Sequence, residues 1–157
     1  MRRRRLVVAF AALLLLGAAA VPLVAFVIVP QLVRSTLVED LPAASVVAAA
    51  PLVAGELVRI SAADYGSGTV RIVRAGDARV LRFDNVDIAG APDVYVYLSD
   101  RSDGAPGSYV DLGKLKATNG SFNYVLPAKV DLGRVRSVVL WCRQFSVTIT
   151  YAVLRAP

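Results

Sequence analysis

Hydrophobic and polar positions alternate with a period of two in a series of short segments between about residue 55 and the end of the chain. Because side chains of a β-strand point alternately to opposite faces, this pattern predicts half-buried strands. The predicted strands are residues 55–60, 68–74, 79–86, 93–100, 121–127, 137–142 and 146–154. Clusters of Gly, Asp, Ser and Pro separate them, and no amphipathic helical pattern intervenes. The predicted fold is all-β, either an antiparallel β-sandwich or a small barrel.

The segment 137–142 is apolar on both of its predicted faces, which is typical of a central strand. Alternation places Cys142 on the same face as Leu140 and puts Trp141 on the opposite face. Another local signal is Asn119-Gly120, a dipeptide that favours a tight hairpin turn before residue 121. Nearer the N-terminus, Ser35 or Thr36 is a candidate N-terminal cap for a short helix.

A different pattern fills the N-terminal region, where residues 6–29 form a run of 24 residues without a charge. At a rise of ~1.5 Å per residue this run is long enough to cross a hydrocarbon core of ~30 Å as a helix. Arg2 to Arg5 precede it and favour a cytoplasmic N-terminus. A cleaved signal peptide, cut after Ala20, is the alternative, but the apolar run continues well past that position.

These patterns divide the chain into four parts. Residues 1–5 are predicted to be a cytoplasmic basic tail, residues 6–29 a transmembrane helix, residues 30–50 a stalk, and residues 51–157 an extracytoplasmic β domain. The predicted location is therefore the cell membrane, with a single pass and the C-terminal domain outside the cytoplasm.

The formal net charge of the 157 residues is +6. The four arginines of the tail account for most of this excess, and the remaining chain has 14 basic and 12 acidic residues. Because the β domain therefore carries little net positive charge, we expect no nucleic-acid partner. The chain has no histidine, which excludes catalytic triads and metal sites that depend on imidazole. No other catalytic constellation is recognisable, no metal site is predicted, and whether the chain is an enzyme stays open.

Cys142 is the only cysteine, so an intramolecular disulfide is excluded. It is either a small hydrophobic residue of the core or a reactive thiol in a compartment where disulfides normally form. Arg136 and Arg143 are close in sequence and would favour a thiolate if they were close in space. Alternation, however, directs Arg143 to the face opposite Cys142.

The motifs "GAPDVYVYLS", "DLGKLK" and "VVLWC" occur in an order and spacing that resemble the DM-thirteen family, also called the electron-transfer DM-thirteen domain. The resemblance covers about residues 55 to 154. It implies a compact β-sandwich-like module of extracytoplasmic proteins, with redox activity through a cysteine that acts as a free thiol or as a haem ligand. That cysteine corresponds to Cys142.

The resemblance also bears on three candidate binding residues, Asp93, Tyr65 and Trp141. Asp93 corresponds to the aspartate of a Gly-Pro-Asp turn in the family. Tyr65 stands near the first glycine turn, where members of the family often have a histidine, and this difference removes a second haem ligand. Trp141 is expected to support Cys142 by packing.

Two functions therefore remain as hypotheses. The first is a membrane-anchored module for redox reactions or electron transfer through Cys142, with an unknown redox partner. The alternative is a non-catalytic module that binds a protein or a glycan at the cell surface through its loops.

Overall fold

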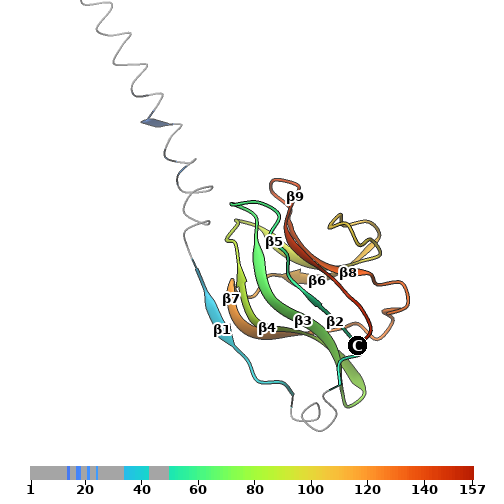
Figure 1. Ribbon diagram of the computed structural model, residues 1–157. Helices are drawn as coiled ribbons and strands as arrows, with labels where there is room; N and C mark the ends of the chain where they lie inside the picture. The colour runs from blue at the N-terminus through green and yellow to red at the C-terminus, as the bar shows by residue number, and fades with distance from the viewer. Residues whose placement is uncertain (1–13, 15–16, 19–20, 22–23, 25–33, 43–49) are drawn as a thin grey trace, which may run out of the picture.

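The computed structural model describes residues 34–42 and 50–157 and a few isolated positions between 14 and 24. Its strands are β1 (Thr36–Val38), β2 (Val53–Glu56), β3 (Gly66–Ala75), β4 (Ala78–Ile88), β5 (Val94–Ser99), β6 (Tyr109–Lys114), β7 (Asn119–Val125), β8 (Ser137–Cys142) and β9 (Val147–Val153). They form a five-stranded sheet in the order β1-β7-β4-β3-β2 and a four-stranded sheet in the order β6-β5-β8-β9. Figure 1 shows the two sheets packed as the layers of a sandwich.

The hydrophobic core fills the space between the sheets. From the five-stranded sheet it receives Leu81 and Phe83 of β4 and Phe122 of β7, and the rings of Phe83 and Phe122 stack with centroids 4.9 Å apart. From the other sheet, Val96 of β5 and Leu140 of β8 project inward as the alternating pattern predicts. The predicted sandwich is confirmed, and the four-stranded sheet is antiparallel as predicted. The five-stranded sheet is mixed, because β1 pairs in parallel with β7. The described strands form two open sheets, so the small barrel is wrong.

A long loop, residues 100–108, folds back over the outer face of the four-stranded sheet. Thr148 of β9 donates a hydrogen bond to the carbonyl oxygen of Gly104 (2.7 Å), and Ser137 of β8 donates one to Arg101 (2.6 Å). A side chain at Gly104 would collide with the ring of Tyr151, so glycine lets the loop approach this ring. The loop therefore helps to bury the outer face of β8, which is a central strand as predicted.

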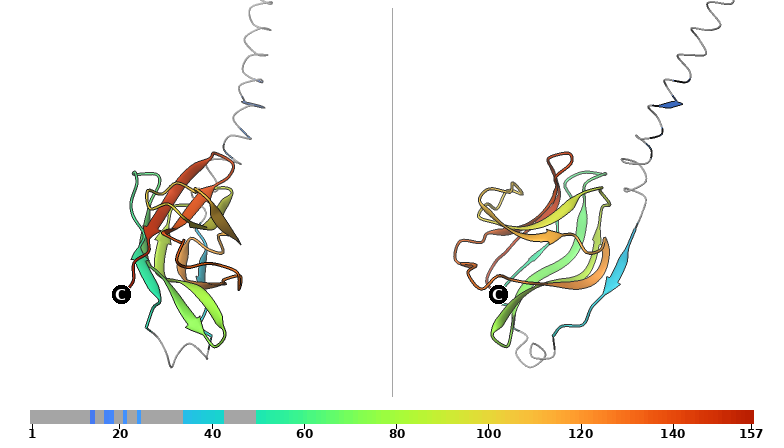
Figure 2. Two further views of the ribbon diagram at one scale, coloured as in Figure 1. Left: turned by 90° about the vertical axis from the view of Figure 1, so that its right-hand side faces the viewer. Right: turned by 180° about the vertical axis from the view of Figure 1, so that it is seen from behind.

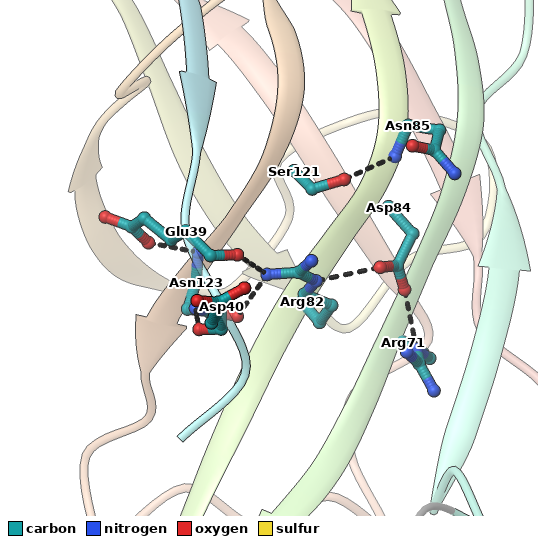
Figure 3. Close-up of polar contacts among 8 residues, drawn as sticks. All are labelled: Glu39, Asp40, Arg71, Arg82, Asp84, Asn85, Ser121 and Asn123. Atoms are coloured by element: carbon teal, nitrogen blue, oxygen red, sulfur yellow. Dashed lines mark hydrogen bonds and ion pairs between the residues drawn. The ribbon is translucent and has the colours of Figure 1, made fainter. Parts of the chain in front are cut away.

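The segment 34–42, which the sequence assigns to a stalk, packs against the five-stranded sheet in the structure. The candidate helix cap is wrong, because Thr36 begins a strand that pairs in parallel with β7. Ser35 and Thr118 exchange several hydrogen bonds at the start of this pairing. At its end, Glu39 accepts a hydrogen bond from the backbone nitrogen of Asn123 (2.8 Å), as Figure 3 shows.

The predicted turn at Asn119-Gly120 is also wrong, because both residues belong to β7. Gly120 has a φ of +106°, and a Cβ atom there would lie 2.2 Å from the carbonyl oxygen of Leu37. Glycine is therefore needed at this position for β1 to approach β7, not for a reversal of the chain. Strand β6 lies in a segment that the alternation did not predict, and it contains Gly113 with a φ of +102°.

Among the described residues, no helix is long and apolar enough to cross a membrane. The predicted transmembrane helix, residues 6–29, lies almost wholly outside the described residues.

The strand directions place particular loops at one end of the sandwich. The start of β1 lies beside Asn119, the first residue of β7. Asn119 pairs with Asp87 near the end of β4, and the end of β4 pairs with Gly66 at the start of β3, so all these residues lie at the same end of the sheet. The loop before β3 and the β8–β9 hairpin lie at this end in all three views (Figures 1 and 2). We call this the entry end, because the chain enters the sandwich here.

Candidate functional site

Cys142 is the last residue of β8 and lies at the entry end of the sandwich. Its side chain points into the core and is 0% exposed. Its cross-strand neighbours are Val94 of β5 and Val147 of β9. The thiol is therefore enclosed by apolar groups, as the core interpretation of this residue predicts.

The two nearby arginines point away from the thiol. Arg143 lies on the outer face, where it donates a hydrogen bond to the hydroxyl of Tyr97 (2.6 Å), and its guanidinium carbon is 3.4 Å from the ring centre of Tyr95. Arg136 lies at the opposite end of β8 and donates to the carbonyl oxygen of Gly133 (2.8 Å). The prediction that Arg143 faces away from Cys142 is confirmed, and neither guanidinium is placed to favour a thiolate.

A haem at Cys142 does not fit this arrangement. The sulfur is fully enclosed in the core, with Cys142 0% exposed. Iron ligation would require the two sheets to separate around the β8 end, which would expose the core. We therefore derive no step through a haem.

Trp141, next to Cys142, points to the outer face and is half-buried. It lines a groove of about 510 Å³ together with Ile60, Val147, Tyr151 and Asp103. Hydrogen bonds from Arg101 and from the backbone nitrogen of Ala105 lower the pKa of Asp103 to about 2. The tryptophan thus belongs to a surface groove, on the opposite side of the sheet from the thiol.

Asp93 and Tyr65 lie in two separate loops of the entry end. Asp93 pairs with Lys114 (3.2 Å), lines a groove of about 250 Å³, and its carbonyl oxygen accepts a hydrogen bond from the backbone nitrogen of Arg143. Tyr65 packs against the core, and the guanidinium of Arg59 lies 4.6 Å from its ring centre. The structure thus brings the backbone of Asp93 next to the end of β8. It does not gather the four candidate residues Asp93, Tyr65, Trp141 and Cys142 around one cavity.

A cluster of tyrosines and charges on the outer face was missed as a unit by sequence reasoning. Tyr97 stacks on Tyr109 with ring centroids 4.0 Å apart, and Arg143 joins Tyr95 and Tyr97 to Asp111. Burial raises the pKa of Tyr97, an effect that Arg143 partly offsets. The alternation in 93–100 placed Tyr95 and Tyr97 together on one face, but Arg143 and Tyr109 reach them only through the strand register.

Many acidic side chains of the loops and strand ends form ion pairs with basic residues. Asp84 pairs with Arg71 and Arg82, Asp87 with Arg34, and Glu39 with Lys116. Within residues 34–42 and 50–157, no three Cys, Asp or Glu side chains are grouped as metal ligands would be.

The fold and the site define a class: a small β-sandwich module with one unpaired cysteine enclosed in its core. The family model described as Electron transfer DM13 matches residues 60–154, and the chain belongs to this family. The match confirms the resemblance seen in the sequence and includes Cys142, Trp141, Asp93 and Tyr65. No curated protein and no solved structure matches the chain.

Proposed function

We propose that this chain is a membrane-anchored, extracytoplasmic redox module whose single thiol, Cys142, exchanges electrons with a partner protein. The observation that carries the proposal is membership of the Electron transfer DM13 family, whose matched region contains the only cysteine of the chain. The thiol is enclosed in the closed sandwich, so the reaction depends on an opening at the end of β8.

The proposed step is thiol–disulfide exchange with a partner's disulfide. The deprotonated sulfur of Cys142 attacks one sulfur of that disulfide, and the partner's S–S bond breaks as a new S–S bond forms. The other partner sulfur leaves as a thiolate and takes up the proton that Cys142 released. This exchange leaves the number of disulfides unchanged. A donor protein with two thiols then attacks the sulfur of Cys142 in the mixed disulfide, which releases the second partner sulfur as a thiolate. The donor's other thiol displaces Cys142 as the donor forms its own disulfide, so two electrons pass from the donor dithiol to the partner's disulfide and Cys142 is restored.

The position of Cys142 supports access by local opening. It is the last residue of β8, and the hairpin residues that follow it are exposed. Ser146, in the same hairpin, has a φ of +53°, a conformation that is costly for a residue other than glycine. Strand ends with exposed backbone open at a lower free energy than the whole domain, so fraying of the β8–β9 hairpin would uncover the sulfur without unfolding the sandwich.

The test is the reaction of the full chain in detergent with an aromatic disulfide such as dithionitrobenzoate. We expect the rate of thiol modification to level off at high reagent concentration. This limiting rate should be at least about tenfold higher than the rate of global unfolding, which is measured separately by Trp141 fluorescence. A Cys142→Ser variant provides the blank. If the thiol reacts no faster than the domain unfolds, Cys142 is a core residue only and the redox proposal fails.

The membrane attachment in this proposal comes from residues 6–29, which act as a single-pass anchor with the N-terminus in the cytoplasm. The uncharged run and the four preceding arginines support it. Two measurements test it: the full chain should stay in the membrane fraction after alkaline carbonate treatment, and protease added outside intact cells should remove the C-terminal domain. Release by carbonate would contradict the anchor.

A groove at the other end of the sandwich favours the alternative function, binding of a protein or glycan. It has a volume of about 270 Å³ and combines the exposed Tyr109 with Asp100, Lys129, Asp131 and Arg134. An aromatic ring among charges of both signs suits a polar partner. If cross-linking on intact cells captures a partner that Tyr109→Ala loses and Cys142→Ser keeps, binding replaces redox exchange as the function.

A further inference from the structure

The entry end carries an unusual group of exposed apolar side chains. Ile60 is 48% exposed, Phe145 43% and Val147 41%. Ile60 and Val147 line the same groove although 87 positions separate them in the sequence, and Phe145 lies two residues before Val147 in the hairpin. We call Ile60, Phe145 and Val147 the apolar tip.

A basic side chain stands directly beside the apolar tip. Arg59 precedes Ile60, and its guanidinium lies over the ring of Tyr65. The other arginine of this end, Arg143, follows β8 but is bound to Tyr97 and Asp111 on the outer face. Apolar and aromatic side chains flanked by arginine suit the boundary between hydrocarbon and phosphate headgroups, where the ring or aliphatic chain is buried and the cation meets the phosphate.

The proposed anchor brings this end of the sandwich close to a membrane. The anchor ends at Val29, and only residues 30–33 separate it from Arg34 at the start of the docked segment. Four residues span at most ~14 Å when fully extended. Since β1 is hydrogen-bonded into the sheet from Ser35 onward, the whole sandwich is held at this short distance from the anchor. The entry end is then the part of the sandwich nearest the membrane.

From the place where the chain enters and the side chains exposed there, we propose that the apolar tip lies against phospholipid headgroups. This inference rests on the proposed membrane attachment and adds an orientation to it. The β8–β9 hairpin that covers Cys142 then faces the lipid, and the groove around Tyr109 faces away from it.

The single tryptophan provides a direct test, because Trp141 lines the groove shared by Ile60 and Val147. The full chain is reconstituted in phosphatidylcholine nanodiscs that contain a lipid with a nitroxide on its headgroup. We expect this lipid to quench the fluorescence of Trp141. The double substitution Ile60→Ser and Phe145→Ser should reduce the quenching at least about twofold, because removal of apolar burial weakens the contact.

The matched control is Val125→Ser, which removes an apolar side chain that is 69% exposed at the far end of β7. This variant should be quenched as strongly as the unsubstituted chain. Absence of quenching, or equal quenching in the double variant and the control, would overturn the proposal.

Two further readouts identify the reason for a negative result. If alkaline carbonate releases the chain, the anchor itself is absent and the proposed attachment fails first. If the chain stays in the membrane, Trp141 is not quenched, and the double variant changes the number of copies per nanodisc, the apolar tip is a contact between copies and the lipid proposal is wrong.

Discussion

Arg71 and Arg82 face each other directly across β3 and β4, and the carboxylate of Asp84 joins them. Its two oxygens lie 2.6 Å from Nε of Arg71 and 2.8 Å from Nε of Arg82 (Figure 3). Arg82 is nearly buried and also donates to the carbonyl oxygen of Glu39, which holds the end of the docked β1 segment. One carboxylate thus permits two cations to occupy a cross-strand pair and connects them to the N-terminal strand.

Replacing Asp84 with Asn should destabilise the domain, because two like charges would remain opposite each other and one of them is nearly buried. We expect the free energy of unfolding to fall by about 1–3 kcal/mol. Urea unfolding of the full chain in detergent measures it. Asp77→Asn, in the exposed β3–β4 turn, is the matched control and should change little. Equal effects of the two substitutions would show that the bridge contributes nothing.

Gly120→Ala should detach β1 from β7, because the new methyl group would collide with the carbonyl oxygen of Leu37. We expect the amides of residues 36–39 to exchange hydrogen rapidly while the rest of the sandwich stays protected, as mass spectrometry would show. Gly113→Ala is a sharp control: its φ is +102°, close to that of Gly120, but nothing lies within 4 Å of the added atom. Strain from positive φ, of about 1–3 kcal/mol, is common to both, so rapid exchange of β1 should appear only in Gly120→Ala. Continued protection of β1 there would disprove the role of this close approach.

Leu140→Asp should prevent stable folding, because Leu140 is fully buried on the inner face of β8. An unpaired carboxylate in the core costs about 3–5 kcal/mol, a large part of the stability of a domain of this size. Circular dichroism and protease resistance would show the loss. Gln144→Asp places the same charge in the exposed hairpin and should be tolerated. A Leu140→Asp chain as resistant to urea as this control would contradict the assigned inner face.

Tyr124 makes the stability of the domain sensitive to alkaline pH. Burial raises its pKa to about 12, because the neutral hydroxyl is enclosed between the backbone of Lys114 and that of Lys116. The folded state therefore holds the proton more tightly than the unfolded state, whose tyrosine titrates near 10. This contribution is complete below pH 10 and is lost as the pH rises from 10 through 12.

We expect Tyr124 to contribute a fall of about 2 kcal/mol in the free energy of unfolding across this range. The fall should be smaller by that amount in Tyr124→Phe, which keeps the decrease due to Tyr97, whose pKa burial also raises. Urea unfolding at pH 9 and pH 11.5 would measure it, with absorbance at alkaline pH reporting phenolate formation. Tyr151→Phe, which removes a half-buried tyrosine, is the control and should keep the full decrease. A decrease of the same size in Tyr124→Phe would assign it to another group.

The sequence predicted the parts of the fold that depend on the two-residue period. The inward direction of Cys142 and Leu140, and the outward direction of Trp141 and Tyr95, follow from that period alone. The central position of β8 followed from its apolar residues on both faces. For the candidate site, the same pattern correctly separated Arg143 from the thiol.

The remaining features depend on contacts between distant parts of the chain. Strand β1 has only three residues, too few for a periodic signal, and it is held by partners such as Thr118 and Asn123 that lie about 80 positions away. Gly120 serves a close approach between strands, although Asn-Gly is typical of a turn. The tyrosine–arginine cluster likewise requires the register of β5, β6 and β8, which no local pattern specifies.

The parallel pairing of β1 with β7 also has a mechanical consequence. A pull on the N-terminal segment acts along the axis of β1, while the C-terminus leaves the sandwich beside β2, toward the opposite end. Tension between the two ends would therefore load β1 in shear, so that the backbone hydrogen bonds of Ser35 to Asn119 and of Glu39 to Ser121 would resist together. A strand peeled sideways would lose such bonds one at a time. Strand β1 and the residues at its two ends thus form an attachment suited to a domain that is held from its N-terminal side.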